Sequence, residues 1–272
     1  MESGKRVAIV TGGASGIGKA LSYELVSQGV FVIVADIVDA DGTTVEKELN
    51  KSRNNARYVH VNVTNFKEVE QMILSIYKEF GRLDYLFNNA GIAMYGELYD
   101  MSMDDWKQMI DVNLWGVIHG TQVGYEMMKE QGFGHLVNTA SAAGLGPSPV
   151  SSVYATTKHA VVGLTTSLHY EAEQFGVKVS TLCPAFVHTP IFDKAKAVNI
   201  DKKMIQKQME KQKVMSPEKL AKITLKNVHK NVPIICPMPM KRTMDIFFTI
   251  VPPAHKALMR LVCKVSRDAR VN

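Results

Sequence analysis

Short apolar segments alternate with longer amphipathic segments along most of the chain. The short segments are β-rich apolar runs and are predicted to be strands, whereas the longer segments between them are predicted to be helices. The predicted strands are Arg6–Val10, Phe31–Ala35, Arg57–Val61, Leu83–Phe87, His135–Thr139, Lys178–Leu182 and Val232–Cys236. The predicted helices are roughly 16–28, 39–52, 65–80, 103–130, 151–175 and 216–229.

This alternation predicts βαβ units and a parallel sheet. The strands are apolar throughout, as expected when helices cover both faces of a sheet. Right-handed crossovers would then give an α/β fold with a Rossmann-type, doubly wound sheet of about seven strands, whose ligands bind beyond the carboxyl ends of the strands. A chain of 272 residues can form this as one domain, which we expect over residues 1–240.

Two segments interrupt the alternation. Residues 186–215 are rich in Lys, Met and Gln. They are predicted to form a partly helical flap over the substrate, although a solvated helix pair without a gating role fits the same pattern. Residues 241–272 follow the last strand and are predicted to be a basic C-terminal extension.

The net charge of +6 is concentrated in that extension. Residues 241–272 carry seven Lys and Arg against two acids, whereas the other 240 residues carry 25 against 24. The near-neutral body gives little support for nucleic-acid binding, so any anionic partner is expected to meet the tail.

The tail has the pattern of a basic amphipathic helix. Such a helix can lie on an anionic membrane surface, or it can pack its apolar face on the body or on a second subunit. Its predicted apolar face holds Ala257, Leu258, Leu261, Val262 and Val265, and Lys256, Arg260, Lys264 and Arg267 are displaced from that face.

The cysteines and the N-terminus indicate a cytoplasmic protein. Cys183, Cys236 and Cys263 are far apart and lack metal-ligand spacing, so we expect reduced thiols and no metal site. The start of the chain leads directly into the first predicted strand, without an apolar signal segment. Peripheral membrane contact through the tail is compatible with this location.

The segment Thr11–Gly18 is rich in glycine and lies between the first predicted strand and the first predicted helix. Glycine allows a sharp turn and a close approach of the backbone to phosphate oxygens, and the helix N-terminus offers free N–H groups. This context predicts a dinucleotide pyrophosphate site at Gly12, Ser15, Gly16, Ile17 and Gly18.

Asp36 ends the second predicted strand, about twenty residues after the glycine-rich segment. A carboxylate there accepts hydrogen bonds from the adenosine ribose and repels a 2′-phosphate, which favours NAD over NADP. NADP remains an alternative, because Lys19 or Arg57 could approach a 2′-phosphate.

Tyr154 and Lys158 are four residues apart on a predicted helix and therefore share one face. A free tyrosine has a pKa of about 10 and is a poor base at neutral pH. A neighbouring cation favours the phenolate and lowers that pKa, so the pair is a candidate proton-transfer device.

At this point the chain resembles the short-chain dehydrogenase/reductase family, from residue 5 to about residue 236. The resemblance depends on six motifs in order: Thr-Gly-x-x-x-Gly-Ile-Gly at 11–18, Asn88-Asn-Ala-Gly91, Asn113, Ser141, the Tyr154/Lys158 pair, and Pro184-Ala-Phe-Val-His-Thr-Pro190.

The resemblance implies a role for each catalytic candidate. Tyr154 would be the general acid/base, and Lys158 would hold the nicotinamide ribose and lower the pKa of the tyrosine. Ser141 would steady the substrate oxygen, and Asn113 would keep a water in a relay to solvent.

It also implies further cofactor contacts. The full set of cofactor residues is then Gly12, Ser15, Gly16, Ile17, Gly18, Asp36, Asn62, Val63, Asn89, Ala90, Gly91, Tyr154, Lys158, Pro184, Val187 and Thr189. Asn62-Val63 stands where the family usually has Asp-Val, which weakens the expected adenine contact. The last strand lacks the Gly-Gly-rich end of many tetrameric members, so a homodimer through 103–130 and 151–175 is expected.

The substrate pocket is expected near the catalytic pair, and no Lys or Arg is obviously placed to bind an acidic substrate. We therefore expect a mostly apolar ketone, aldehyde or secondary alcohol, although several lining candidates could be ordinary core. The lining candidates are Ser141, Ala142, Leu145, Tyr154, Phe186 and Phe192, with Met94, Tyr95, Pro147 and Ile191 nearby.

The sequence thus predicts an NAD(P)-dependent oxidoreductase acting on CH–OH groups. The alternatives are an NADPH-preferring carbonyl reductase and a non-catalytic protein that senses dinucleotide. A scaffold held at a membrane by the tail is a third class. The complete set of Asn113, Ser141, Tyr154 and Lys158 argues against a pure sensor or scaffold.

Overall fold

The computed structural model describes residues 4–51, 54–201, 214–238 and 249–267. Its main sheet has seven parallel strands in the order β3-β2-β1-β4-β6-β7-β9. The strands are β1 Val7–Thr11, β2 Phe31–Asp36, β3 Ala56–His60, β4 Tyr85–Asn88, β6 Gly134–Thr139, β7 Val177–Leu182 and β9 Ile234–Ile235. The predicted doubly wound sheet is confirmed, and each predicted strand matches an observed one with ends shifted by at most two residues.

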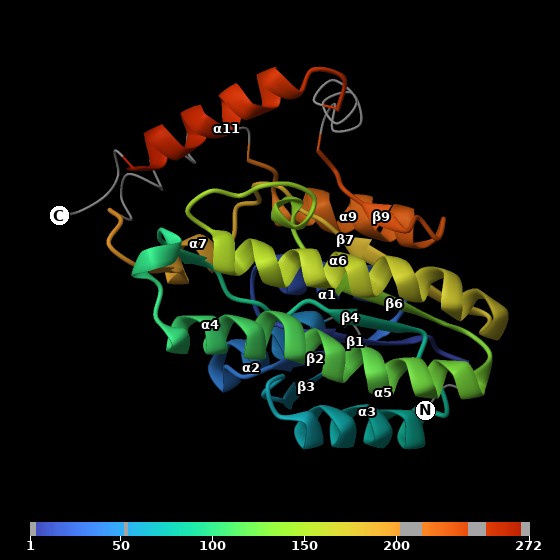
Figure 1. Ribbon diagram of the computed structural model, residues 1–272. Coiled ribbons are helices and arrows are strands. Elements are labelled where there is room, and N and C mark those ends of the chain that lie inside the picture. The colour runs from blue at the N-terminus through green and yellow to red at the C-terminus, as the bar shows by residue number, and fades with distance from the viewer. Residues whose placement is uncertain (1–3, 52–53, 202–213, 239–248, 268–272) are drawn as a thin grey trace.

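Helices cover both faces of this sheet (Figure 1). One layer contains α1 Gly16–Ser27, α2 Asp39–Leu49 and α9 Pro217–Val228, and the other contains α3 Phe66–Phe80, α4 Met103–Ile110, α5 Gly116–Gln131 and α6 Ser152–Ala172. The single helix predicted at 103–130 is divided, because a π-helical turn at Asp111–Trp115 separates α4 from α5.

The chain crosses from one half of the sheet to the other between β3 and β4, so the strand order reverses where β1 and β4 lie side by side. β2 and β3 extend to one side of β1, and β4, β6, β7 and β9 extend to the other. Loops that leave the carboxyl ends of β1 and β4 therefore diverge, and the gap between them is where open α/β sheets bind ligands.

Part of the predicted flap at 186–215 is described. It contains α7 Ile191–Lys194 and the short strand β8 Lys196–Ala197, which pairs in parallel with β5 Met94–Tyr95. The sequence did not predict this small second sheet, because each strand has only two residues. Residues 202–213 of the predicted flap lie outside the described residues.

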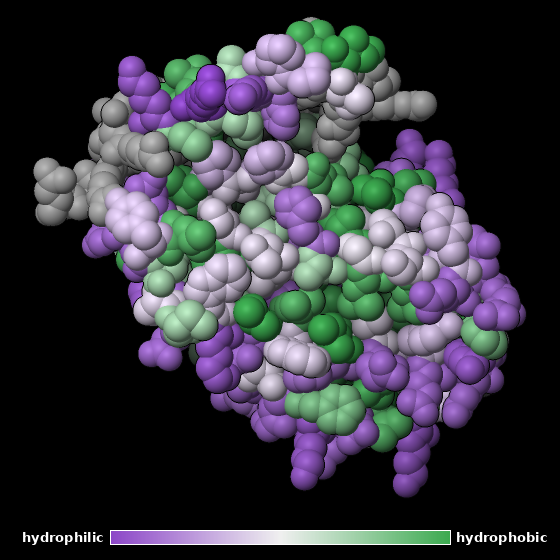
Figure 2. Space-filling model, viewed as in Figure 1, coloured by the Kyte–Doolittle hydropathy of each residue, from purple (hydrophilic) through white to green (hydrophobic). Residues whose placement is uncertain are grey.

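The tail forms α11 Pro252–Arg267, which lies across one side of the body (Figures 1 and 2). The predicted helix is confirmed, but its apolar face does not pack on the body. Leu258, Leu261 and Val265 are all exposed, whereas His255, Met259 and Cys263 are partly covered. The other tail residues singled out from the sequence, in 241–248 and 268–272, lie outside the described residues, as does the side chain of Arg267. Among the described helices none has both the length and the apolarity needed to cross a bilayer.

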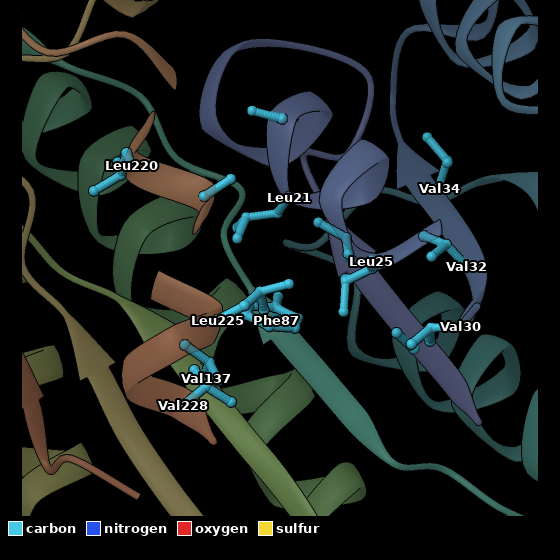
Figure 3. Packing of buried hydrophobic residues seen from close by; sticks show 14 of the residues in the cluster. Leu21, Leu25, Val30, Val32, Val34, Phe87, Val137, Leu220, Leu225 and Val228 are labelled. Atoms are coloured by element: carbon cyan, nitrogen blue, oxygen red, sulfur yellow. The ribbon is translucent and has the colours of Figure 1, made fainter. Parts of the chain in front are cut away.

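Alternate residues of the central strands enter two separate cores. In β1, Ala8 and Val10 pack with α1 and α9, whereas Val7 and Ile9 pack with α3, α5 and α6. Figure 3 shows the first core, in which leucines of α1 and α9 pack against Phe87 and Val137 on one face of the sheet. This two-sided burial explains why the strands are apolar throughout.

His135 is a buried polar residue at the start of β6, with 4% of its surface exposed. Its Nε2 lies 2.9 Å from Oγ of Ser180, and that hydroxyl donates its own hydrogen to the carbonyl oxygen of Val232. Nε2 must therefore carry a hydrogen and donate it to Ser180. Burial, with smaller effects of Lys178 and the neighbouring histidines, lowers the pKa of His135 to about 3.

We expect this histidine to make the fold sensitive to acid. Between pH 6.5 and 3 the unfolded chain binds a proton at His135 that the folded chain does not, so the free energy of unfolding falls as the pH falls. From pH 7 to pH 5 the free energy of unfolding falls by about 2 kcal/mol.

The variant His135→Gln tests this assignment, because it keeps a hydrogen-bond donor to Ser180 and removes the titrating group. Urea unfolding at the two pH values should show a smaller loss for His135→Gln than for the native chain; equal losses would contradict the assignment.

Candidate active site

The glycine-rich turn after β1 packs against the turn after β4. Gly12 has a φ of +63°, and a Cβ added to it would lie 2.9 Å from Cα of Ala90. A Cβ on Gly18 would lie 2.0 Å from the carbonyl oxygen of Gly12. Any side chain at these positions would push the two turns apart, so glycine is required for the close approach.

The N-terminus of α1 faces this turn with free donors. Its N-cap residue is Ser15, whose side chain makes no capping hydrogen bond. The backbone N–H groups of Gly16, Ile17 and Gly18 open the helix and have no intrahelical acceptor. Together with the helix dipole, they fit a pyrophosphate, which supplies negative oxygens as acceptors.

Asp36 lies at the end of β2, beside the glycine-rich turn. Its Oδ2 accepts a hydrogen bond from the backbone N–H of Ala14 at 3.0 Å, and its Oδ1 accepts one from that of Val38 at 3.2 Å. The carboxylate is therefore fixed beside the glycine-rich turn, and each oxygen keeps a second acceptor position for a ribose hydroxyl.

The two cations that could have met a 2′-phosphate are paired elsewhere. Lys19 contacts Glu48 at 2.9 Å. Arg57 donates two hydrogen bonds to Glu79, at 2.8 and 2.6 Å, and lies three residues before the end of β3 that is level with Asp36. The alternative based on Arg57 is therefore wrong, because its side chain is held by α3 away from the carboxyl edge.

The turn after β4 is tied to the glycine-rich turn by Thr11. Its hydroxyl accepts hydrogen bonds from the backbone N–H groups of Asn89 at 2.9 Å and Ala90 at 3.1 Å. The side chain of Asn89 in turn donates to the carbonyl oxygen of Thr11 at 3.1 Å. Thr11 was not singled out as a separate site residue from the sequence, because a threonine before glycines has no chemical signature of its own.

Asn62 and Val63 lie on the loop after β3, at the same edge. The side-chain oxygen of Asn62 accepts hydrogen bonds from the backbone N–H of Thr64 at 3.1 Å and its hydroxyl at 2.9 Å. Val63 is buried, and its carbonyl oxygen lies 2.9 Å from Nδ1 of His119. The asparagine oxygen thus serves a local turn, which leaves its amide nitrogen for another partner.

Lys158 is the most enclosed charged group in the candidate site. It is 3% exposed, and its Nζ donates a hydrogen bond to the main-chain oxygen of Thr139 at 3.0 Å. The same Nζ lies 5.5 Å from the centre of the Tyr154 ring, one helical turn earlier on α6. Ser141, which follows β6, lies close enough to Tyr154 for its side chain to lower the pKa of the phenol. The structure therefore brings together the three residues predicted to move a proton.

Asn113 joins this group through the π-helical turn. Its side-chain amide donates to the carbonyl oxygen of Ile92 at 2.9 Å and accepts from the N–H of Ile92 at 2.8 Å. A Cβ on Gly91 would lie 3.1 Å from Oδ1 of Asn113 and 3.5 Å from Nζ of Lys158, so the three residues are neighbours. π-Helical turns are often found at functional sites, because they re-aim one side chain of a helix.

Burial is the largest cause of the pKa shifts of Tyr154 and Lys158. It raises the pKa of Tyr154, and the hydrogen bond from Ser141 opposes part of this rise. Burial also lowers the pKa of Lys158 to about 8. The predicted lowering of the tyrosine pKa by Lys158 is therefore not seen in the protein alone, because the ammonium is itself desolvated and donates to Thr139 instead.

The loop after β7 returns to the glycine-rich turn. Thr189 lies against the glycine-rich turn, since a Cβ on Gly16 would be 3.2 Å from Cβ of Thr189. The carbonyl oxygen of Pro184 accepts a hydrogen bond from the N–H of Ala142 at 2.8 Å, and Val187 is buried. These residues thus lie between the glycine-rich turn and the segment that carries Ser141.

The predicted substrate residues divide into two groups. The rings of Phe186 and Phe192 lie 6.4 Å apart, and Phe186 is 40% exposed, as expected for a pocket wall. Met94 is 2% exposed and belongs to a core cluster against which Tyr154 packs, so its expected place in the lining is wrong. Leu145 packs against another cluster with only partial exposure.

A hollow of about 990 Å³ lies between Pro147 and α11. Its walls include Lys256, Arg260 and Lys264, so three cations do lie near the loop that follows Ser141. The sequence could not reveal this placement, because it depends on how the tail folds back over the body.

Known proteins are similar to this chain in sequence and in fold. The family model of short chain dehydrogenases matches residues 6–199. A 3-alpha-(or 20-beta)-hydroxysteroid dehydrogenase of Mycobacterium bovis is 37% identical over 188 residues, which cover 69% of this chain and 71% of that protein.

Two solved structures are also similar. A short chain dehydrogenase/reductase of Burkholderia phymatum in complex with NAD is 30% identical, with a TM-score of 0.82 over 90% of this chain and 92% of that one. ElxO with NADP bound is 28% identical, with a TM-score of 0.72 over 85% of this chain and 97% of that one. With the family model matching well over half of its length, the chain belongs to the short-chain dehydrogenase family of oxidoreductases.

Proposed function

We propose that the protein interconverts a secondary alcohol and a ketone, or the corresponding aldehyde, on a mostly apolar small molecule, with NAD(H) as the cofactor. The observation that carries this proposal is the placement of Tyr154 beside Ser141 and the buried Lys158, on the same sheet edge as the glycine-rich turn. A nicotinamide dinucleotide bound there would accept or supply the hydride.

The chain offers separate groups for each part of the dinucleotide. The pyrophosphate would lie at the N-terminus of α1, where Gly12, Ser15, Gly16, Ile17 and Gly18 leave donors free. Asp36 would bind the adenosine ribose, and Lys158 the nicotinamide ribose through the ammonium hydrogens not given to Thr139. The remaining contacts would come from Asn62, Val63, Asn89, Ala90, Gly91, Pro184, Val187 and Thr189.

Tyr154 would transfer the proton at the substrate oxygen, and Ser141 would stabilise charge on that oxygen as it develops. The raised pKa of Tyr154 keeps the phenol protonated in the protein alone. The protonated phenol is the form that can donate to a carbonyl oxygen, as carbonyl reduction requires. Asn113, held by Ile92 and next to Lys158, would support a relay that returns the proton.

An apolar substrate is supported by the exposed ring of Phe186 and its partner Phe192. The similarity to a hydroxysteroid dehydrogenase supports the same class of compound. NAD is favoured over NADP because Asp36 is fixed at the ribose position and Lys19 and Arg57 are paired with glutamates.

We also infer that two copies pair through α5 and α6, which belong to the same helix layer. Trp115, at the start of α5, has 48% of its surface exposed, and its indole stacks on His119 at 5.9 Å. A large exposed aromatic side chain on this face is typical of a surface that another subunit covers.

We expect Tyr154→Phe to abolish turnover, because it removes the only proton that the phenol can give. The loss in kcat should be roughly 100- to 10,000-fold, the usual contribution of a positioned acid or base. Tyr170→Phe, which changes an exposed tyrosine on the same helix, is the matched control. The measurement is initial rates on apolar ketones, with fluorescence titration of NADH to show that binding survives. Near-normal turnover in Tyr154→Phe would remove the mechanism.

Asp36→Asn should relax the choice of cofactor, because it removes the charge that repels a 2′-phosphate. The ratio of kcat/KM with NADH to kcat/KM with NADPH should fall roughly 10- to 100-fold, the range expected for a hydrogen bond to a charged group. Asp41→Asn, an exposed carboxylate on α2, serves as the control. An unchanged ratio in Asp36→Asn would show that another group selects the cofactor.

A further inference from the structure

The outer face of α11 is apolar and open to solvent. Leu258, Leu261 and Val265 follow one another at helical spacings of three and four residues and are 36%, 57% and 40% exposed. Ile250 and Val251, just before the helix, are 73% and 37% exposed. A contiguous apolar strip of this kind on a water-facing helix marks a surface that a partner covers.

A row of cations lies along one side of this strip. Lys256, Arg260 and Lys264 are spaced four residues apart and are exposed, and none of them makes an ion pair within the described part of the chain. Residues 249–267 contain no Asp or Glu. Like charges four residues apart repel each other on a helix. A negatively charged partner would therefore stabilise this row of cations. Figure 2 shows hydrophilic side chains along the near side of α11, beneath hydrophobic ones at its outer edge.

The inner face of α11 is formed by residues outside the apolar strip, and the cation row lies beside it, since Lys256, Arg260 and Lys264 also line the hollow. His255, Met259 and Cys263 point to the side of Pro147, where they help to line the hollow. The helix therefore makes its contact with the body without Leu258, Leu261 or Val265, and the outer strip remains available for a separate partner.

We propose that α11 docks the protein on an anionic lipid bilayer. A helix of 16 residues is about 24 Å long and can lie flat, with its apolar strip among the acyl chains and its cations at the headgroups. A second copy of the chain fits less well, because a two-fold contact along α11 would bring two basic rows together.

Docking would bring the substrate side of the protein to the bilayer. Pro147, which lines the hollow with α11, lies in the segment that follows Ser141. An apolar alcohol or ketone dissolved in lipid would then reach the site without crossing water. This consequence rests on the proposed function, whereas docking itself does not.

The test is co-sedimentation of the full-length protein with phosphatidylcholine vesicles, with and without phosphatidylglycerol. We expect binding to the anionic vesicles, weak binding to phosphatidylcholine alone, and release by high salt. The charge-reversed variant Lys256→Glu/Arg260→Glu/Lys264→Glu should lose at least about 100-fold in partition coefficient, since each cation near such a surface contributes about fivefold.

The matched control is Lys219→Glu/Lys222→Glu/Lys226→Glu on α9, which changes the net charge equally at three exposed lysines away from α11. It should retain nearly native binding. For the apolar strip, Leu261→Gln should lower binding about tenfold. Leu74→Gln, an exposed leucine on α3, should not.

Two outcomes would overturn the proposal: no binding of the native protein to anionic vesicles, or equal losses in the two charge-reversed variants. If the native protein ignores vesicles and Leu261→Gln dissociates an oligomer in sedimentation velocity, the strip binds a second copy instead. Tyr154→Phe should bind vesicles like the native protein, so a failure of the proposed activity is distinguishable from a failure of docking.

Discussion

The buried ammonium of Lys158 is the interaction on which the candidate site depends. Its hydrogen bond to the main-chain oxygen of Thr139 attaches α6 to the carboxyl end of β6. The same group touches the position of Gly91 and lies one helical turn from Tyr154. Three parts of the chain therefore meet at one charge. Burial of Lys158 lowers its pKa, and burial of Tyr154 raises the pKa of the phenol.

The order of the strands explains why the cofactor residues are dispersed in the sequence yet adjacent in space. The loops after β1 and β4 diverge at the switch point of the sheet, and the hydroxyl of Thr11 joins their first residues. The loop after β7 reaches back to the same place, where Thr189 meets Gly16. The tail then adds a basic helix beside Pro147, in the segment that follows Ser141, with Leu258, Leu261 and Val265 exposed.

The fold and the polar site were accessible from the sequence because each has a local signal. Apolar runs with helices between them predict a parallel sheet. The spacing of four residues between Tyr154 and Lys158 predicts that both side chains lie on one face of a helix. The features that the sequence did not predict depend on tertiary contacts. The pairing of Arg57 with Glu79, the burial of Met94 and the outward rotation of the α11 strip are set by neighbours distant in the chain. The lowered pKa of Lys158 likewise results from burial in the folded protein, which the spacing of residues in the sequence does not reveal.

The most direct test of this account is the titration of Lys158 itself. The protein can be labelled with ¹³C at the ε-carbon of lysine and followed by NMR as the pH rises, with Lys158→Arg identifying the signal. The account predicts a midpoint at about 8 for Lys158, because burial has lowered its pKa below the ordinary lysine value of about 10.4. A midpoint for Lys158 equal to that of the exposed lysines would contradict it.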